Sequence, residues 1–485
     1  MMATTDHLPL ITMLLHVARV IFILLEVLIL FNLLIVVHEL GHFLAARWRG
    51  LYIEKFGVWF GKPLWKKTIN GVQYSLGSLP FGGYVALPQL APMDIIEGKA
   101  DVDRARLPKI SALDKIIVAI AGPLFSLLLA LFFAGIVWAV GYPVGEGDST
   151  TVIGYVLPDS PAQKVGLQPG DKILSVDGKP VSRFSGMNDS IVWDIVGSEG
   201  DKIAVKFERD GKVQTVWVEP YKAHTRGWRR KSVRQLLISP AETPIIDKVE
   251  PNTPAARAGL RSGDIVRGFD KTPIYHPIAL LEYISKHPSD ELVLHVERGG
   301  EKFDVPVKPT LLPTNGEKKP RIGIQWDTAG IMSIQHPNPI EQVYNSVTST
   351  LKTIGAVASP KSDVKLQHLS GPVGIWNIYV KLFEAEGGWK LALWFSVILN
   401  VNLAILNMLP IPVLDGGHIV LAIIESIRRR PVNMRVLEVV QTSCAAVIIG
   451  YMLYITFFDV QDLPFVRKTL DQFEANSPAK DTQAP

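Results

Sequence analysis

The sequence predicts a multi-pass α-helical membrane protein that carries a repeated α+β module between its second and third membrane spans. Three observations lead to this fold class: four long apolar stretches, a gap-free internal repeat, and a polar motif at the end of the first apolar stretch. At 485 residues the chain has room for three or four domain-sized units. Its 48% apolar content, combined with strongly charged segments, indicates a mixture of membrane and soluble regions.

Four stretches are long and apolar enough to cross a hydrocarbon core of about 30 Å as helices. They are residues 9–37, 116–140, 390–414 and 436–458. No basic segment precedes the first stretch and no small-residue cleavage site follows it, so we expect a retained span and not a signal peptide. The single cysteine, Cys444, excludes an internal disulfide framework and a cysteine-based metal cage.

The distribution of basic residues predicts how the chain is oriented in the membrane. The net charge is only +4, and we expect no nucleic-acid partner. Two connections are basic, one after the first span and one between the third and fourth. Their basic residues include Arg47, Arg49, Lys55, Lys62, Lys66, Lys67, Arg428, Arg429, Arg430 and Arg435. The positive-inside rule places both connections in the cytoplasm, so we expect both termini and the middle of the chain on the outer face.

The middle of the chain contains two copies of one module. PDSPAQKVGLQPGDKILSVDGKP from Pro158 aligns without gaps with PNTPAARAGLRSGDIVRGFDKTP from Pro251. In each copy, Ser/Thr-Pro-Ala begins a short helix, with Ser or Thr as the cap and Pro-Ala in the first turn. Gly-Asp then forms a turn that leads into a strand rich in β-branched residues. The pattern resembles the PDZ domains associated with bacterial proteases, which bind extended peptides by strand addition. The alternative is a pair of spacers or steric shields without a peptide ligand.

A histidine and glutamate motif follows the first apolar stretch. His38, Glu39 and His42 form His-Glu-x-x-His, a signature of zinc hydrolases. On a helix, residues four apart lie about 40° apart around the axis and roughly 6 Å along it, so the two imidazoles face one point. Glu39 is offset so that it can act as a general base. The alternative is that these groups are incidental and reach only to the membrane surface.

A third zinc ligand must come from elsewhere, because catalytic zinc usually takes three protein ligands. Asp415 is the only acidic residue in the apolar segment near the end of the third span. Pro410 and Pro412 cannot continue a regular helix, and a break at this depth must be buried in protein or line a wet cavity. His418 competes for the role, but it follows two glycines towards the basic connection, so we prefer Asp415.

These features together resemble the site-2 protease family of intramembrane zinc metalloproteases. The motifs are His-Glu-Leu-Gly-His, Asn-Met-Leu-Pro-Ile-Pro-Val-Leu-Asp-Gly at 407–416 and the paired modules, together with LPFGGYV at 79–85, AGP at 121–123 and LSGP at 369–372. The resemblance implies one Zn2+ per chain, held by His38, His42 and Asp415, with Glu39 as the catalytic base.

The resemblance also implies substrate-handling residues. They are the paired asparagines Asn402 and Asn407, the helix-breaking Pro410 and Pro412, and Gly82 and Gly83 in a membrane re-entrant β-loop at 72–87. Close relatives carry Gly-Phe-Gly ahead of that loop, where this chain has Trp59-Phe60-Gly61.

The implied protein has four transmembrane helices, a re-entrant β-loop and two α+β PDZ domains, and it lies in the bacterial inner membrane. The PDZ domains and both termini would lie on the periplasmic side. The implied reaction is cleavage of the transmembrane segment of a single-span membrane protein, either a trimmed anti-sigma factor or a remnant signal peptide. A catalytically inactive membrane-embedded PDZ adaptor is the alternative, and the complete ligand set with its glutamate disfavours it.

The expected organisation has six parts. They are a first membrane part at 1–145, PDZ domains at 146–235 and 236–335, an amphipathic linker at 336–388, a second membrane part at 389–460 and a disordered polar tail at 461–485. In the linker, apolar residues at helical spacing predict a helix that lies on the outer membrane surface or packs against the second module. These residues are Ile340, Val343, Val347, Leu351 and Ile354. Glu26, deep in the first span, has no assigned role.

Overall fold

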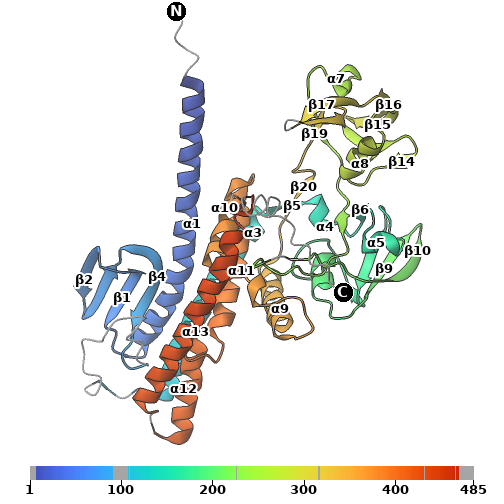
Figure 1. The fold of residues 1–485 in the computed structure, drawn as a ribbon. Helices are drawn as coiled ribbons and strands as arrows, with labels where there is room; N and C mark the ends of the chain where they lie inside the picture. Colours follow the sequence, from blue (N-terminus) through green and yellow to red (C-terminus); the bar gives the residue numbers. More distant parts are fainter. Residues whose placement is uncertain are drawn as a thin grey trace, which may run out of the picture. The chain divides into compact units, whose positions relative to one another are not determined.

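The computed structural model describes residues 7–90, 107–108, 110–225, 227–314, 317–430, 432–464 and 466–468. The chain forms two compact units, which are drawn together in Figure 1. The first unit consists of residues 1–142, 336–350 and 366–485, and the second unit consists of residues 143–335 and 351–365. Residues 469–485 of the predicted polar tail lie outside the described residues.

Within the described residues, four helices are long and apolar enough to cross a membrane, which confirms the predicted number of spans. They are α1 (His7–Trp48), α3 (Ala112–Val140), α11 (Gly388–Asn407) and α13 (Met434–Gln461). Two boundaries differ from the prediction. The first helix continues through the histidine motif, and the third ends at Asn407 instead of 414 because the chain approaches Pro410 and Pro412, which cannot continue a helix.

Helix α3 packs against both α1 and α11. Leu34 of α1, Ala130 of α3 and Val401 of α11 belong to one buried cluster that joins the three helices. A further helix, α12 (Asp415–Arg428), also packs on α3. There Lys115 Nζ lies 2.7 Å from Glu425 Oε2. Three helices, α1 from the start of the chain and α11 and α12 from its last quarter, are therefore held around α3.

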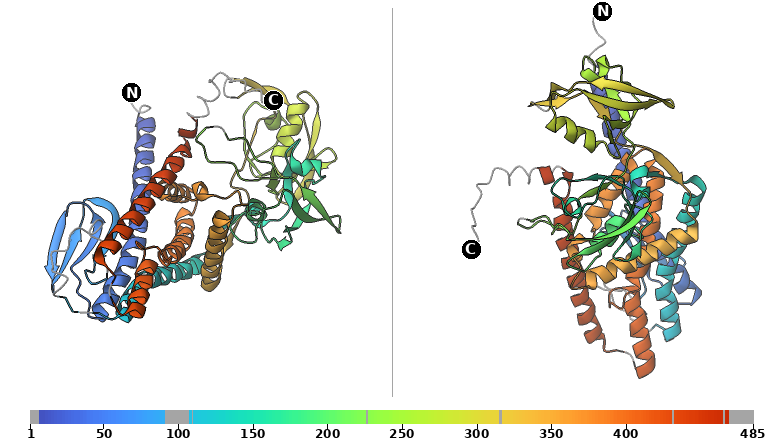
Figure 2. Two further views of the ribbon diagram at one scale, coloured as in Figure 1. Left: turned by 60° about the horizontal axis from the view of Figure 1, so that its bottom comes forward. Right: turned by 90° about the vertical axis from the view of Figure 1, so that its right-hand side faces the viewer.

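The LSGP segment begins helix α10 (Pro372–Glu384) and is held by the fourth span. The Asp459 carboxylate on α13 accepts hydrogen bonds from the backbone N–H groups of Gly371 and Gly374, both at 2.9 Å. A Cβ at Gly374 would lie 2.7 Å from the same carboxylate. Glycine at these positions therefore lets α10 pack closely against α13. Figure 2 gives two further views of the ribbon.

Helix α9 (Pro339–Ala358) forms where the amphipathic linker helix was predicted. Val343 and Val347 pack against the cluster that joins α1, α3 and α11, a partner that the apolar stripe by itself did not identify. The side chain of Gln342 is also buried, and its Nε2 donates to the Ala134 carbonyl of α3 at 3.0 Å. Ile340, from the same stripe, is 68% exposed. The stripe is thus divided between packed and exposed positions.

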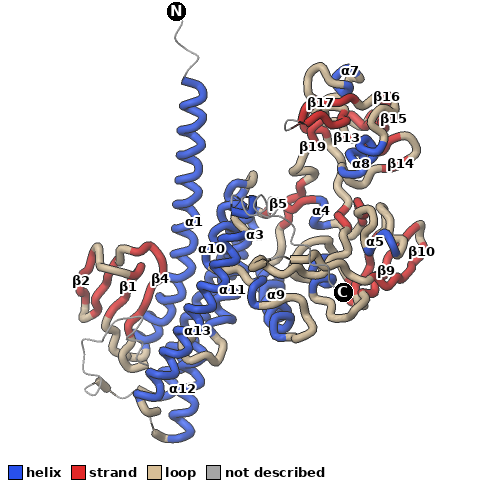
Figure 3. Tube along the Cα trace, in the orientation of Figure 1, coloured by secondary structure: helices blue, strands red, loops and turns tan. Residues whose placement is uncertain are grey.

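A four-stranded sheet lies beside the second half of α1 (Figures 1 and 3). Its strands are β1 (Lys55–Phe60), β2 (Trp65–Ile69), β3 (Val72–Leu76) and β4 (Leu79–Ala86). The order β2-β3-β1-β4 leaves β4 at one edge, and β4 contacts α1. Val85 of β4 packs with Phe43 of α1 and Val118 of α3 in one buried cluster. This cluster attaches the sheet to the two helices.

The second unit contains two modules with the same strand order. The first has β6 (Ile153–Val156), α5 (Pro161–Lys164), β7 (Lys172–Val176), β8 (Lys179–Pro180), α6 (Ile191–Val196), β9 (Ile203–Arg209), β10 (Lys212–Val218) and β11 (Ile238–Pro240). The second has β12 (Ile246–Val249), α7 (Pro254–Arg257), β13 (Ile265–Phe269), β14 (Thr272–Pro273), α8 (Ile278–Lys286), β15 (Leu292–Arg298), β16 (Glu301–Val307) and β19 (Ile324–Trp326). The sheets run β10-β9-β7-β8 and β16-β15-β13-β14.

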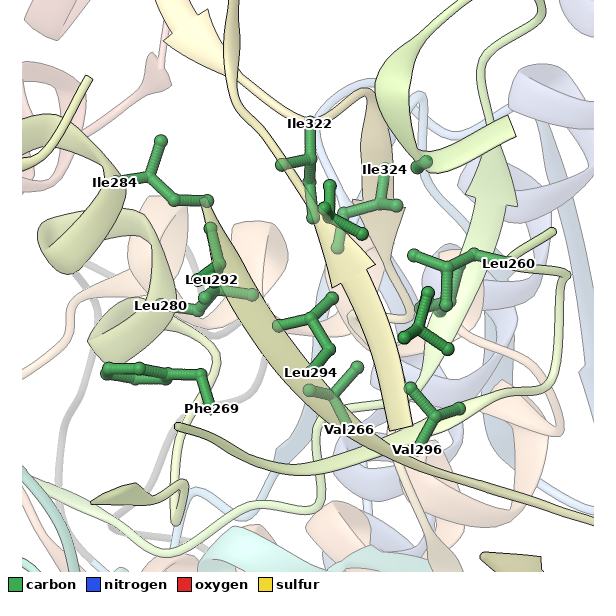
Figure 4. Packing of buried hydrophobic residues seen from close by; sticks show 14 of the residues in the cluster. Leu260, Val266, Phe269, Leu280, Ile284, Leu292, Leu294, Val296, Ile322 and Ile324 are labelled. Atoms are coloured by element: carbon green, nitrogen blue, oxygen red, sulfur yellow. The ribbon is translucent and has the colours of Figure 1, made fainter. Parts of the chain in front are cut away.

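Shorter elements complete the chain. They are β5 (Tyr142–Gly145), α4 (Glu146–Ser149), β17 (Thr310–Thr314), β18 (Glu317–Arg321), β20 (Met332–Gln335) and the short 3-10 helix Leu366–His368. In the second module, side chains of α8 and of the sheet form one apolar core, where Leu280, Val266 and Leu294 lie together (Figure 4).

The Gly-Asp pair of each repeat ends in a buried ion pair. Arg209 Nε donates to Asp171 Oδ1 at 2.6 Å, and Arg298 Nε donates to Asp264 Oδ1 at the same distance. Both carboxyl groups are almost fully buried. The two arginines end strands β9 and β15, which occupy equivalent places in the two sheets. The repeat in sequence is therefore also a repeat in side-chain contacts.

The buried Asp264 predicts a pH dependence of the second module. Burial by itself would raise the pKa of Asp264, but hydrogen bonds from Arg298 and the Arg261 backbone, with the charges of both, hold that pKa below its ordinary value. A lowered pKa stabilises the module above about pH 4, and this contribution is lost as the pH falls through the folded-state pKa. We expect Asp264→Asn to remove the contribution and to destabilise the module by about 3 kcal/mol.

Hydrogen exchange of the β13 and β15 amides in the full chain measures this effect. The matched control is Asp247→Asn, because Asp247 is exposed on the same module. Equal protection in the two variants at neutral pH would show that the Asp264–Arg298 pair does not stabilise the fold.

Candidate metal centre

The two histidines of the motif converge on one point. His38 and His42 lie one turn apart on α1, and their Nε2 atoms are 3.3 Å apart. His38 is buried, with 7% of its surface exposed. Both imidazoles turn towards α3, which packs closely along α1 at this level. The helical spacing of the motif therefore creates a pair of nitrogen ligands on the protected side of α1.

Helix α3 orients both imidazoles through their other nitrogen. His42 Nδ1 lies 2.8 Å from the Val118 carbonyl, and His38 Nδ1 lies 3.0 Å from Ser126 Oγ. A carbonyl can only accept, so His42 Nδ1 carries the proton and its Nε2 keeps a free lone pair. Such supporting contacts fix the tautomer and ring direction of metal-binding histidines. The sequence reasoning missed these partners, although Ser126 follows the AGP segment closely.

Glycines make the close approach of α1 and α3 possible. A Cβ built on Gly122 of α3 would lie 2.2 Å from His42 Nε2. A Cβ on Gly41 of α1 would lie 2.4 Å from the Ala121 carbonyl oxygen. Any side chain at either position would force the two helices or the His42 ring to move. The AGP segment at 121–123 therefore provides the space that His42 occupies.

Asp415 reaches the histidines from the turn between α11 and α12. It is the first residue of α12, and its Oδ2 and Oδ1 lie 3.3 Å from His38 Nε2 and His42 Nε2 respectively. The turn folds tightly over the first residues of α12, because a Cβ at Gly416 or Gly417 would lie within 2.3 Å of a backbone carbonyl. The Gly-Gly pair thus lets the broken helix bring Asp415 to the two imidazoles.

The three side chains have the composition and spacing of a metal site. Ligand atoms of His38, His42 and Asp415 all lie within 4.8 Å of one another. Asp415 Oδ2 is buried, and no donor among the described residues is aligned to hydrogen-bond with it. Two imidazoles and a carboxylate form a donor set that suits zinc and leaves a coordination position open. His418 is not a member of this cluster, although it also lies near the start of α12.

Glu39 lies next to the edge strand β4 and is not one of the three clustered residues. A Cβ built on Gly83 would lie 3.3 Å from Glu39 Cγ. Gly82 has φ of +83°, and a Cβ there would collide with the Phe60 ring. Both glycines of the LPFGGYV segment are therefore required for the close passage of β4, and Gly83 brings the strand's backbone to the predicted base.

The remaining predicted site residues lie at the end of α11. Asn402 lies within α11 and Asn407 is its last residue, while Pro410 and Pro412 lie in the turn that leads to Asp415. Thr350 of α9 donates a hydrogen bond from Oγ1 to Asn402 Oδ1. The sequence reasoning did not identify Thr350, because its threonine-rich helix carries no motif. Asn402 is thus tied to the helix that follows the second module.

Trp59 occupies a backbone conformation that favours glycine. Its φ is +69°, in the left-handed region that bulky residues rarely adopt. The pairing of β1 with β4 shifts register between Val58 and Phe60, on either side of Trp59. The departure from glycine noted in the sequence therefore falls on a β-bulge.

The chain is similar in sequence to known proteins over most of its length. The model for peptidase family M50 matches residues 26–451, a range that includes every predicted site residue. A Neisseria meningitidis protein named as a zinc metalloprotease is 31% identical over 83% of this chain and 91% of its own length. The regulator of sigma-E protease RseP of Escherichia coli is 28% identical over 84% of this chain and 91% of its own length.

Among solved structures, the PDZ domain of the SdrC-like protein from Listeria monocytogenes shares 22% identity. The matched region covers 18% of this chain and 87% of that domain, with a TM-score of 0.16. This likeness is too small to carry a conclusion about the fold.

Proposed function

The chain belongs to peptidase family M50, and from this premise we propose that His38, His42 and Asp415 hold one zinc ion with Glu39 as the general base. The family and the relatives identify the chain as a site-2-type zinc metalloprotease that acts in the membrane. The observation that carries the residue assignment is the convergence of the three ligand groups from α1 and α12. Glu39 follows His38 directly on α1.

The chain's own residues can perform the steps of peptide hydrolysis. A bound zinc ion supplies Lewis-acid activation of water and of the scissile carbonyl. Glu39 accepts the proton of the attacking water and then delivers a proton to the leaving amine, so that one water is consumed for each bond broken. Val118 and Ser126 hold the two imidazoles in the ligand orientation throughout. Packing of α1 against α3 limits access of bulk water from that side.

The proposed substrate binds as an extended strand. A membrane-spanning helix hides its carbonyl groups in backbone hydrogen bonds, so it must unwind before it can be cut. Strand β4 is the edge of its sheet and passes Glu39 at Gly83, so it can pair with an unwound segment. Gly82, Gly83, Asn402 and Asn407 would handle this segment, while Pro410 and Pro412 keep α11 from continuing past the site.

We propose that the substrates are single-span membrane proteins of the bacterial inner membrane. The name of the E. coli relative, a regulator of sigma-E protease, supports an anti-sigma factor trimmed on its outer side, and remnant signal peptides offer the same chemistry. The segment 72–87, which contains strands β3 and β4, would be the re-entrant β-loop. The two modules would be periplasmic PDZ domains with peptide ligands. Their shared strand order supports two copies of one fold.

The experiment that tests the function compares the wild type and two variants, each co-expressed with tagged single-span proteins. We expect the wild type to release a fragment cut inside the transmembrane segment and Glu39→Gln to release none while keeping its metal, because Glu39 is outside the ligand cluster. Glu26→Gln is the matched control, since it changes the same group on the same helix. An inactive PDZ adaptor predicts no bound zinc and equal substrate lifetimes in all three.

The orientation of the chain is tested by cysteine labelling. In a Cys444→Ser background, we expect Ser149→Cys to react with a membrane-impermeant thiol reagent in cells whose outer membrane is permeabilised. Arg429→Cys should not react, because the basic connections are predicted to be cytoplasmic. The reverse labelling pattern would place the two modules in the cytoplasm and overturn the proposed topology.

A further inference from the structure

One buried polar side chain links the catalytic helix to the sheet. Asn32 of α1 is only 8% exposed and lies six residues before His38. Its Oδ1 accepts a hydrogen bond from Trp59 Nε1 of β1 at 2.8 Å. Its Nδ2 donates to the Pro80 carbonyl of β4 at 3.0 Å and to the Leu28 carbonyl of its own helix at 2.8 Å. A single amide therefore holds two neighbouring strands of the sheet.

The backbone of β1 is distorted at the residue that makes this contact. Trp59 has φ of +69° and lies where the pairing of β1 with β4 changes register. The bulge adds two residues to β4, because Val58 pairs with Gly83 and Phe60 with Leu79. Bulges redirect side chains, and here the Trp59 side chain opposite the bulge reaches Asn32. Left-handed backbone at a bulky residue is strained and persists only where its surroundings hold it. The hydrogen bond to Asn32 and the pairing on both sides of the bulge supply that support.

The sheet contacts α1 at two levels. Asn32 and Glu39 are seven residues apart, which is about 10.5 Å along a helix and returns to nearly the same face. Pro80 and Gly83 are three residues apart on β4, in the segment where the pairing with β1 shifts register and Gly82 has φ of +83°. Pro80 is bonded to Asn32, and Gly83 lies against Glu39. Strand β4 therefore runs alongside α1 in one defined register between these two contacts.

We infer that Asn32 and Trp59 form a positioning pair that fixes the register of edge strand β4 relative to Glu39. This inference rests on the proposed function and deepens it, because a substrate strand paired with β4 inherits that register. A shift of one residue moves a strand by about 3.3 Å and turns its side chains to the opposite face. The pair would thus determine which peptide bond of the unwound substrate reaches Glu39.

The test uses the purified full-length chain and four variants, one of which combines the changes at Asn32 and Trp59. Trp59→Phe keeps the aromatic ring but removes the N–H donor, and Asn32→Leu removes all hydrogen bonding by the amide. Trp65→Phe is the matched control, because Trp65 lies on β2 of the same sheet and is 52% exposed. The measurements are zinc content, hydrogen exchange in residues 55–60 and 79–86, and the masses of the fragments cut from a single-span substrate.

We expect Trp59→Phe and Asn32→Leu to keep the metal and to exchange the β1 and β4 amides about tenfold faster, the factor that loss of one hydrogen bond allows. Cleavage should spread to neighbouring bonds, and the double variant should resemble Asn32→Leu alone because both changes remove the same bond. The control should match the wild type. A cleavage position unchanged in both variants overturns the inference, even if the sheet exchanges faster, because the pair would then be only a structural tie.

Two features keep this outcome interpretable. If Asn32→Leu does not insert, Trp59→Phe decides the question, since it removes the indole N–H donor in a strand residue outside the four spans. If the wild type cleaves none of the candidate substrates, the proposed function fails. Unchanged exchange in Trp59→Phe would then still refute the pair, independently of that failure.

Discussion

Asp415→Ala is expected to abolish both zinc binding and substrate cleavage while leaving the chain inserted in the membrane. The carboxylate lies 3.3 Å from each histidine Nε2 and is the only acidic member of the ligand cluster. Loss of a contact that merely supports a ligand lowers metal affinity 10- to 100-fold. Loss of a ligand itself should therefore lower zinc affinity by more than about 100-fold. Metal analysis of the purified variant and detection of the cleaved fragment measure the two effects.

His418→Ala is the matched control for this experiment. His418 lies three residues further along α12 and is also a potential ligand by chemistry, but it is not part of the cluster. We expect the control to retain zinc. If Asp415→Ala keeps its metal and His418→Ala loses it, the third ligand is His418 and the assignment of Asp415 is wrong.

Gly122→Ala is expected to have the next largest effect, although it changes no ligand. The new methyl group would lie 2.2 Å from His42 Nε2, and the ring cannot simply turn away without losing its hydrogen bond to Val118. We expect zinc affinity to fall about 10- to 100-fold, as when a metal-binding histidine loses its supporting contact. Competition with a chelator of known affinity measures the change.

The same helix provides the control. Gly135 also lies on α3, and a Cβ built there has no neighbour within 4 Å. Gly135→Ala should therefore bind zinc like the wild type, and it removes the helix-destabilising effect of glycine in the same way as the test variant. Equal zinc affinity in the two variants would show that the space beside His42 is not needed.

Local sequence patterns predicted much of this protein. The four apolar stretches follow from length and composition alone, and the part of the chain that the structure describes has four such helices. His38 and His42 are one turn apart, so any helix through the motif presents both imidazoles to one point. Pro410 and Pro412 disfavour a regular helix in their own segment, which identified the break before Asp415. These predictions succeed because each depends on residues that are close together in the sequence.

The tertiary structure alone decided which groups support these residues. The Val118 carbonyl and Ser126 contact histidines that lie 76 and 88 residues away, and Thr350 contacts Asn402 across 52 residues. Trp59 contacts Asn32 through a bulge that no periodic pattern announces. Such contacts depend on how closely helices and strands approach one another, which glycines such as Gly122 and Gly83 allow. The spacing of residues along one element does not encode the distance between the backbones of two elements.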